Sequence, residues 1–275
     1  MRVAALVPNL PGLAPGQRVR IESWTGYLEG RGWTVDLYPF ESEQLHEVIY
    51  RRGRGPAKAR GLAVCYYRQL RRVLTMPRCD VLFVYREAAL VGPAVLERLA
   101  ARTGAPFLYD LDDPTFVRYR SPTSGWASLL KFHGKTHGLF RRADHVIAIN
   151  DLIGDYATRY NPSVTVIPNF VDTEKFVPAA APPPDPVRLV WIGSHTTAPN
   201  LVEIAPALAR LQADRDVVLC AVGAGDMSVP GVKVEARPWS SETELADLHT
   251  GHVGLVPLND LPWNRWKFFF KTVQY

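Results

Sequence analysis

Short apolar runs rich in β-branched residues alternate with helix-like segments along this chain. The runs of strand type are Val3–Val7, Trp33–Tyr38, Val81–Tyr85, Pro106–Tyr109, His145–Ile149 and Val164–Ile167. The helix-like segments between them are Arg18–Gly30, Pro56–Leu74, Pro93–Thr103, Trp126–Arg141 and Leu152–Tyr160. Strands that alternate with helices of this length predict right-handed βαβ units and a parallel sheet. Asp151 is expected to cap the last of these helices.

A proline-rich segment, Pro178–Pro186, interrupts the alternation and is typical of a stiff, extended linker. After it, strand-type runs and helix-like segments resume. They are Val187–Ile192, Pro199–Leu211, Val217–Val222, Val232–Glu235, Glu242–His249 and Val253–Pro257. Pro206 should kink the first of the helices or remove one of its hydrogen bonds. We therefore predict an α/β fold with two Rossmann-like, doubly wound domains: residues 1–175, a linker over 176–186, and residues 187–275.

Composition narrows the function classes. The chain has 275 residues, 47% of them hydrophobic, and a net charge of +5 from 32 basic and 27 acidic residues. This mild excess favours phosphate-bearing partners and is too weak to indicate nucleic-acid binding. The cysteines are few, widely spaced and without a CxxC pair: Cys65, Cys79 and Cys220. We expect reduced thiols in a cytoplasmic protein, with no zinc site and no membrane-spanning segment.

The last 23 residues, Val253–Tyr275, form a strand, a loop and the start of a helix. In doubly wound domains, ligands bind where a loop leaves the carboxyl end of a strand and enters a helix. The basic side chains Arg265, Lys267 and Lys271 suit a phosphorylated ligand, and nearby tryptophans could stack on a flat ring. The alternative is an aromatic core with a solvated basic edge.

Two glycine turns follow strands in the second predicted domain. Gly193 and Ser194 come after one strand, in a position that lets backbone amides approach phosphate. Gly223 follows the next strand and could border a nucleotide base. A plain turn remains the alternative for both.

Several segments resemble retaining glycosyltransferases of family 4, which have the GT-B fold. The similar segments are Gly12–Arg20 (GLAPGQRVR), Ala143–Asn150 (ADHVIAIN), Val166–Asp172 (VIPNFVD), Leu189–Ser194 (LVWIGS), Gly254–Leu258 (GLVPL) and Lys271–Tyr275 (KTVQY). The resemblance implies a hexosyl transfer with retention of configuration from a nucleoside-diphosphate sugar to a glycan or lipid-linked acceptor. It implies polysaccharide biosynthesis, with the nucleotide sugar as co-substrate and no bound cofactor or metal.

The resemblance also implies roles for particular residues. Donor-binding candidates are Gly193, Ser194, Gly223, Arg265, Lys267, Lys271 and Gln274. The acceptor-side candidates are Gly16, Arg18 and Arg20, which the resemblance implies, and Arg86 and Glu87, which follow the end of a strand. An ordinary surface ion pair is the alternative for Arg86 and Glu87. Catalytic candidates are Asp110, Asp112 and Lys271, with the aspartates orienting the acceptor hydroxyl or accepting its proton and Lys271 neutralising the leaving diphosphate.

Asp110 and Asp112 also form a DxD motif, which holds a divalent cation in a different glycosyltransferase fold. The metal interpretation is the weaker one here, because the motif lies in the middle of an alternating two-domain chain. Asp113, before a proline, is expected to shape the turn. His133 and His137, four residues apart, are expected to form a polar helix face.

The sequence departs from the family pattern in two ways. It ends before segments that normally follow Tyr275, so it resembles a truncated member with an incomplete second domain, which raises the question of whether this chain is active. Trp266 and Gln274 stand where many relatives have two glutamates. Two alternatives therefore stay open: a sugar-nucleotide 2-epimerase of the same fold, and a non-catalytic protein that binds sugar nucleotides or a membrane surface.

The segment Arg51–Leu74 has seven arginines and one lysine interleaved with apolar residues. A helix of this composition can rest on an anionic inner leaflet, which would place the protein peripherally at the cytoplasmic membrane face. The alternative is a solvated helix whose aliphatic arginine stems cover apolar surface.

Overall fold

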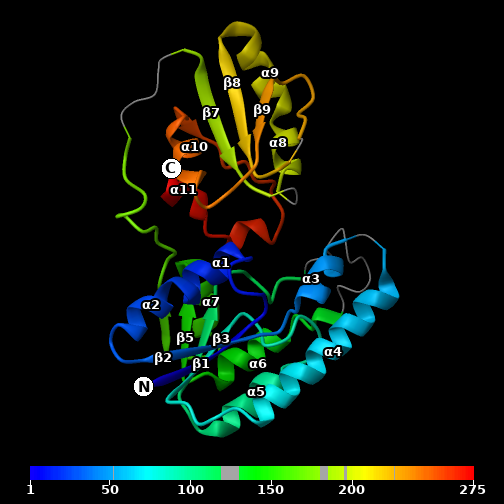
Figure 1. Ribbon diagram of the computed structural model, residues 1–275, viewed down its shortest axis with the longest axis vertical. Helices are drawn as coiled ribbons and strands as arrows, with labels where there is room; N and C mark the ends of the chain where they lie inside the picture. Colours follow the sequence, from blue (N-terminus) through cyan, green and yellow to red (C-terminus); the bar gives the residue numbers. More distant parts are fainter. Residues whose placement is uncertain (52, 119–129, 180–184, 195–196, 226) are drawn as a thin grey trace. The chain divides into compact units, whose positions relative to one another are not determined.

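The computed structural model describes residues 1–51, 53–118, 130–179, 185–194, 197–225 and 227–275. The chain forms two compact units, which are shown in Figure 1. Unit 1 is Met1–Asn169 with Trp266–Phe268, and unit 2 is Phe170–Arg265 with Phe269–Tyr275. Unit 1 thus ends a few residues before the boundary expected from sequence. It also includes a three-residue segment close to the C-terminus. Part of the expected linker falls outside the described residues.

The described strands of unit 1 form one parallel six-stranded sheet in the order β2-β1-β3-β4-β5-β6. Their bounds are β1 Arg2–Val7, β2 Thr34–Pro39, β3 Val81–Tyr85, β4 Phe107–Leu111, β5 His145–Ala148 and β6 Val164–Val166. The chain moves from β1 to β2 on one side and then continues with β3 on the other. The carboxyl ends of β1 and β3 therefore flank a topological switch point, where doubly wound sheets bind ligands.

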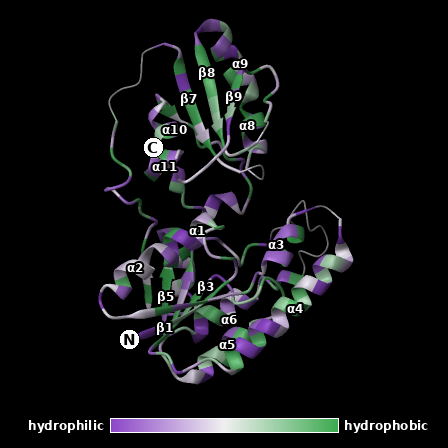
Figure 2. Ribbon diagram, in the orientation of Figure 1, coloured by the Kyte–Doolittle hydropathy of each residue, from purple (hydrophilic) through white to green (hydrophobic). Residues whose placement is uncertain are grey.

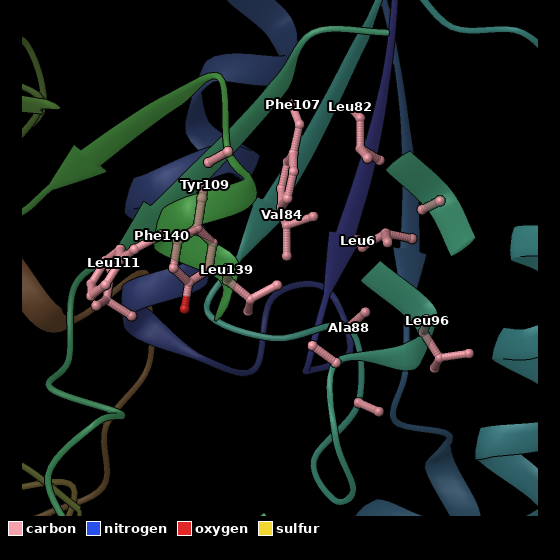
Figure 3. Packing of buried hydrophobic residues seen from close by; sticks show 14 of the residues in the cluster. Leu6, Leu82, Val84, Ala88, Leu96, Phe107, Tyr109, Leu111, Leu139 and Phe140 are labelled. Carbon is pink, nitrogen blue, oxygen red and sulfur yellow. The ribbon is translucent and has the colours of Figure 1, made fainter. Parts of the chain in front are cut away.

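Helices cover both faces of this sheet. They are α1 Pro15–Gln17, the π-helical turn η1 Arg18–Glu22, α2 Ser23–Glu29, α3 Glu43–Ile49, α4 Gly55–Leu74, α5 Val95–Ala100, the 3-10 turn η2 Ala101–Thr103, α6 Lys135–Arg142 and α7 Asp151–Thr158. The larger core lies between the sheet and α3 to α7, and Figure 3 shows Leu6, Val84 and Phe107 among its buried side chains. On the other face, Ile21 from η1 packs with β1 and β3 residues such as Val7.

Unit 2 has a parallel sheet whose four described strands run in the order β10-β7-β8-β9. Its elements are β7 Val187–Ile192, α8 Pro199–Glu203, α9 Ala205–Asp214, β8 Val217–Val222, β9 Val234–Arg237, α10 Glu244–His249, β10 Val253–Gly254 and α11 Phe270–Gln274. The 3-10 turn η4, Asn264–Trp266, leads into the segment that belongs to unit 1. Strand β7 is followed by β8 on one side and paired with β10 on the other. The switch point of this sheet therefore lies between β7 and β10.

The predicted fold class is confirmed: both units are Rossmann-like, with parallel strands and intervening helices. The sheet strands are apolar while most helices alternate polar and apolar residues, as Figure 2 shows. This pattern arises because parallel strands are covered on both faces, whereas each helix keeps one face in water.

Several local predictions need correction. The helix expected over Arg18–Gly30 begins with a π-helical turn, and α3 was not predicted. Asn150, rather than Asp151, caps α7, because its Oδ1 accepts a hydrogen bond from the Ile153 amide at 2.9 Å. Of the helix expected over Trp126–Arg141, residues 126–129 lie outside the described residues, 130–134 are not α-helical, and the helix begins at Lys135 as α6.

The predictions for unit 2 also differ from the structure in places. The helix expected over Pro199–Leu211 is divided at Ile204, and Pro206 lies in the first turn of α9, where its missing N–H costs nothing. The strand expected over Val253–Pro257 pairs only at its first two residues.

Candidate functional site

The switch point of unit 1 gathers polar side chains from α1, η1 and the ends of β3 and β4. Among them, Arg20 lies in the π-helical turn, a feature often found at functional sites. Its guanidinium forms a bidentate ion pair with Asp110 on β4, with Nε–Oδ1 at 3.0 Å and Nη2–Oδ2 at 2.6 Å. Its other terminal nitrogen donates to the carbonyl of Ile167. Both charged side chains are buried, at 4% and 2% exposed.

Burial raises the pKa of Asp110 to about 6, because removing the carboxylate from water outweighs the stabilisation by Arg20. The positive charge of Arg20 opposes this effect of burial and favours the ionised form of Asp110 at neutral pH. A buried charge pair of this kind becomes strongly destabilising if one partner is lost. The pair thus holds η1 against the end of β4.

A second ion cluster surrounds Asp112, the residue that follows β4. Arg86 donates to Asp112 from Nε and from Nη2, the latter at 2.7 Å, and also pairs with Asp113 at 2.6 Å. The buried Tyr85 hydroxyl donates to Asp112 Oδ2 at 2.7 Å. Burial opposes ionisation of Asp112, but Arg86 and the hydrogen bonds from Arg86 and Tyr85 outweigh it, and the pKa falls below its ordinary value.

The backbone of Arg86 has a left-handed conformation, with φ of 55°. This conformation is unfavourable for a residue with a Cβ and persists where the surroundings hold it, as at many functional sites. Here the Arg86 amide donates to the Asp110 carbonyl at 2.9 Å, and the Tyr109 hydroxyl donates to the Arg86 carbonyl at 2.9 Å. Backbone and side chain are both fixed, so the guanidinium is preorganised at the strand end.

Gly16 in α1 covers this cluster. A Cβ at this position would lie 2.4 Å from Asp112 Oδ2 and 2.5 Å from the Tyr85 hydroxyl oxygen. The loop can therefore close over the carboxylate only because residue 16 has no side chain. The predicted acceptor-side residues Gly16, Arg20 and Arg86 are thus brought together with Asp110 and Asp112.

Asp110 and Asp112 each face an arginine rather than open space. The geometry consequently supports a positioning role for both, and direct proton transfer by either one stays a prediction from sequence. Asp113 does more than shape the turn, because its carboxylate also pairs with Arg86. Its pKa is raised by burial. Within the described part of the chain, no three His, Cys, Asp or Glu side chains gather as a metal site would need.

The remaining acceptor-side candidates lie nearby. Glu87 does not form the surface pair considered with Arg86; its carboxylate lies 2.6 Å from the ammonium of Lys135, a side chain only 5% exposed. Arg18 is half-buried in η1. His133 precedes α6 and contacts the Thr115 carbonyl, whereas His137 lies within α6 and contacts the Tyr156 hydroxyl, so the two do not share one helix face.

Two glycine turns meet at the carboxyl end of the unit 2 sheet, after the neighbouring strands β7 and β8. Gly193 follows β7, and its amide donates to the Val222 carbonyl at 2.9 Å. Gly223 follows β8 with φ of 90°, and a Cβ there would lie 2.6 Å from the Gly193 carbonyl oxygen. A Cβ on Gly193 would in turn meet the Trp191 ring at 2.3 Å. Both turns therefore require glycine, and the Gly223 amide in turn donates to the Arg237 carbonyl at 2.9 Å.

Lys271 reaches the same place from α11. Its ammonium lies 4.7 Å from the centroid of the Trp191 ring, which is only 1% exposed. One turn later, the Tyr275 hydroxyl accepts from the Ile192 amide at 3.2 Å and donates to the Leu255 carbonyl at 3.3 Å. Tyr275 thus fastens α11 between β7 and the chain after β10, while the Lys271 ammonium lies over the Trp191 ring.

An apolar hollow of about 430 Å³ lies against α8, lined by Ala198, Pro199, Val202, Glu203 and Met227. Trp239, at the end of β9, is 39% exposed, and its Cβ lies 3.1 Å from the position of a Cβ on Gly223. Aromatic and apolar surfaces next to a glycine turn suit a nucleobase.

The other predicted donor residues lie in different surroundings. Arg265 is 66% exposed and forms a bidentate pair with Asp260, at 2.6 Å for both contacts. Gln274 donates to Glu244 Oε1 at 3.1 Å. Ser194 accepts backbone hydrogen bonds through its carbonyl at the turn before α8. The helices α8 and α11 have only five residues each, so their dipoles contribute little to binding a phosphate.

Lys267 belongs to unit 1, as does Trp266. The Trp266 ring packs edge-on against Phe116, with centroids 5.1 Å apart, and its carbonyl accepts from Asn150 Nδ2 at 2.9 Å. Trp266 is therefore a packing residue of unit 1, which agrees with the aromatic core that the sequence left open as the alternative.

Sequence reasoning missed several residues that shape both sites. Gln17 is fully buried and exchanges two hydrogen bonds with the Asn9 backbone at 3.0 Å, which holds the loop before α1. Tyr85 and Tyr275 act through their hydroxyl groups. Tyr85 stands at a strand end in the sequence, which is a usable signal. Gln17 and Tyr275 carry no local signal of this kind.

Comparison with known proteins agrees with this arrangement. The family model Glycosyltransferase Family 4 matches residues 15–175, which is more than half of the chain. A search among curated proteins found no match.

Solved structures show a similar fold. A sucrose-phosphate synthase from Thermosynechococcus elongatus has a TM-score of 0.63 at 14% identity, covering 94% of this chain and 77% of the other. A trehalose-6-phosphate protein from E. coli bound with UDP-2-fluoro glucose has a TM-score of 0.59 at 13% identity, covering 94% and 79%. An alpha-glucosyltransferase in complex with UDP has a TM-score of 0.54 at 13% identity, covering 94% and 74%.

These neighbours have the GT-B glycosyltransferase fold, with which the two Rossmann-like units agree. The family match shows that the chain belongs to Glycosyltransferase Family 4.

Proposed function

We propose that this protein transfers a hexosyl group from a nucleoside-diphosphate sugar to a glycan or lipid-linked acceptor, with retention of configuration. Unit 2 binds the donor and unit 1 binds the acceptor. The observation that carries the proposal is the arrangement at the carboxyl end of the unit 2 sheet, where Gly193 and Gly223 meet and Lys271 lies over the neighbouring Trp191 ring. Retention is inferred from family membership alone.

Departure of the sugar leaves negative charge on the diphosphate, which fixed donors must stabilise. Lys271 supplies a cation, and the glycine turns let backbone approach the phosphates. The apolar hollow and Trp239 offer surfaces for the base. Two structural neighbours, the E. coli protein and the alpha-glucosyltransferase, carry UDP-2-fluoro glucose and UDP, so uridine nucleotides are the first donors to test.

We further propose that the transfer needs no bound metal. Asp110 and Asp112, the DxD carboxylates, are engaged by Arg20 and Arg86. The leaving group would instead be neutralised by Lys271. The acceptor would bind over the preorganised Arg86 and the η1 turn of unit 1. With a lipid-linked acceptor, the protein would act in polysaccharide biosynthesis. It would do so at the cytoplasmic face of the membrane.

Calorimetry with UDP and other nucleoside diphosphates tests the donor site. We expect Lys271→Ala to weaken binding roughly tenfold, because it removes one charge-assisted contact to phosphate. Arg210→Gln, which removes an exposed charge from α9, is the control and should bind normally. Equal affinity of the wild type and Lys271→Ala would remove this lysine from the site.

Turnover assays separate the alternatives. Product formation in excess chelator supports the metal-free mechanism, and the anomeric configuration of the product, read by NMR, tests retention. Turnover of the sugar nucleotide without any acceptor would favour the 2-epimerase. Tight nucleotide binding with neither reaction would favour the non-catalytic alternative.

A further inference from the structure

The longest helix of unit 1 lies in a segment with an unusual charge. Between Arg51 and Cys79 the sequence has eight arginines and one lysine but no aspartate or glutamate. This local charge exceeds the +5 of the whole chain, so the remaining residues are net negative. The positive charge of the protein is therefore concentrated on and around α4, rather than spread over its surface.

One side of α4 serves the fold. Cys65, Gln69 and Val73 are buried against the core of unit 1. Arg68 donates to the carbonyls of Phe40 and Glu41, the latter at 2.9 Å, and Arg72 donates to the Pro39 carbonyl at 3.0 Å. These two arginines satisfy backbone groups after β2, which gives them a structural role.

The opposite side of α4 carries a second, exposed stripe: Arg60, Val64, Tyr67, Arg71 and Leu74. The steps of four, three, four and three residues place these side chains on one helix face. Val64 is 58%, Tyr67 64% and Leu74 65% exposed, and both arginines are exposed as well. Figure 2 shows hydrophilic and hydrophobic residues alternating along this helix. We call these five residues the α4 outer stripe.

We propose that the α4 outer stripe docks this protein on an anionic lipid bilayer, with the helix lying in the plane of the interface. Large apolar side chains can enter the boundary between headgroups and acyl chains, while arginines beside them bind lipid phosphates. Tyrosine is favoured at this depth because its ring is apolar and its hydroxyl polar. No helix in the described part of the chain is long and apolar enough to cross a bilayer.

The combination of positive and apolar side chains favours an anionic bilayer over a protein groove or a nucleic acid. An uncharged protein groove would leave Arg60 and Arg71 without partners, and a nucleic acid would gain little from Val64 and Leu74. Each arginine near an anionic surface contributes on its own, and the apolar residues contribute independently of charge. Docking on a bilayer would bring the proposed transferase to a lipid-linked acceptor, and this part of the inference rests on the proposed function. The docking itself needs no transferase activity.

Vesicle flotation tests the docking with the whole chain. Wild-type protein should float with phosphatidylcholine vesicles that contain about one-third phosphatidylglycerol, and not with phosphatidylcholine alone. Two double variants, Arg60→Gln/Arg71→Gln and Tyr67→Ser/Leu74→Ser, should each bind roughly tenfold more weakly. All four side chains are exposed, so the variants should melt like the wild type.

Matched controls distinguish binding through the α4 outer stripe from a general effect of the protein's net charge or exposed apolar residues. Arg210→Gln/Arg215→Gln removes the same charge from exposed positions of unit 2, and Leu152→Ser removes an exposed leucine from α7. Both should bind vesicles within about twofold of the wild type. The proposal is overturned if wild-type protein ignores anionic vesicles, or if the controls lose as much binding as the stripe variants.

A parallel UDP titration keeps this result distinct from the proposed function. Stripe variants that lose vesicle binding but bind UDP normally support the docking surface. Vesicle binding without any UDP affinity would overturn the proposed donor site and leave the docking surface intact. Binding of the stripe to nucleic acid with no binding to vesicles would overturn the docking proposal.

Discussion

The contact between Lys271 and Trp191 makes a quantitative prediction about unit 2. The ammonium lies 4.7 Å from the centroid of a ring that is 1% exposed. Cation–π contacts contribute about 0.5–1 kcal/mol at exposed sites and about 2 kcal/mol when desolvated. Lys271 is half-buried, so we expect a coupling of about 1 kcal/mol between the two side chains.

A double-mutant cycle measures this coupling. It compares the wild type, Lys271→Met, Trp191→Leu and the double variant; Met keeps the length of the lysine stem without its charge. Trp191→Leu alone should cost about 2–4 kcal/mol through the cavity it leaves, but this cost cancels in the cycle. A fifth protein, Trp191→Phe, keeps a ring face and should retain part of the coupling.

Hydrogen exchange of the β7 amides is the suitable assay, because it reports the opening of unit 2 without contributions from unit 1. The free energies of opening should be non-additive by about 1 kcal/mol, with Lys271→Met costing less once Trp191 is gone. Additivity within about 0.3 kcal/mol would refute the reasoning, and Lys271 would then be held by other contacts.

Three further perturbations probe unit 1. Gly16→Ala should lower the unfolding free energy by about 1–3 kcal/mol through its clash with Asp112, whereas Gly26→Ala, at an open position in α2, should raise it by about 0.5–1 kcal/mol in the same urea titration. Arg20→Met should cost about 3–5 kcal/mol, and adding Asp110→Leu should recover most of it; a double variant as unstable as the single one would contradict a dominant buried-charge penalty. The folded pKa of Asp110, about 6, lies above its ordinary value, so its contribution to stability is present at acidic pH and is lost as the pH rises through 6. The unfolding free energy of the wild type minus that of Asp110→Asn should therefore fall between about pH 4 and 6, and a rise would show that the pKa is not elevated.

Much of the fold could be predicted because its strands are unambiguous in sequence. Val81–Tyr85, Val187–Ile192 and Val217–Val222 were predicted to the residue, since buried parallel strands are continuous apolar runs. Helix boundaries were less accurate. The π-helical turn and the division at Ile204 depend on tertiary packing, to which local propensity is insensitive.

The candidate sites were predicted in part. Strand-end reasoning found Arg86, Asp110, Asp112 and Gly193, because the carboxyl ends of parallel strands meet at one edge. The pairings were not predicted: Arg20, a candidate from the family resemblance, reaches Asp110 across 90 positions in sequence, and Tyr275 reaches Ile192 across 83. For Trp266 the sequence left stacking on a ligand and an aromatic core open, and in the structure it packs in unit 1 against residues from distant segments.

By itself, the sequence determined the class of fold, the strands and the chemical types available at their ends, because hydrophobic periodicity and turn residues act over short distances. Only the tertiary structure decided which charges neutralise each other and which remain exposed. Asp112 is enclosed by Arg86 and Gly16, Lys271 rests on Trp191, and the α4 outer stripe faces solvent. The physical reason is that burial and ion pairing depend on contacts between residues far apart in the chain, which no local pattern records.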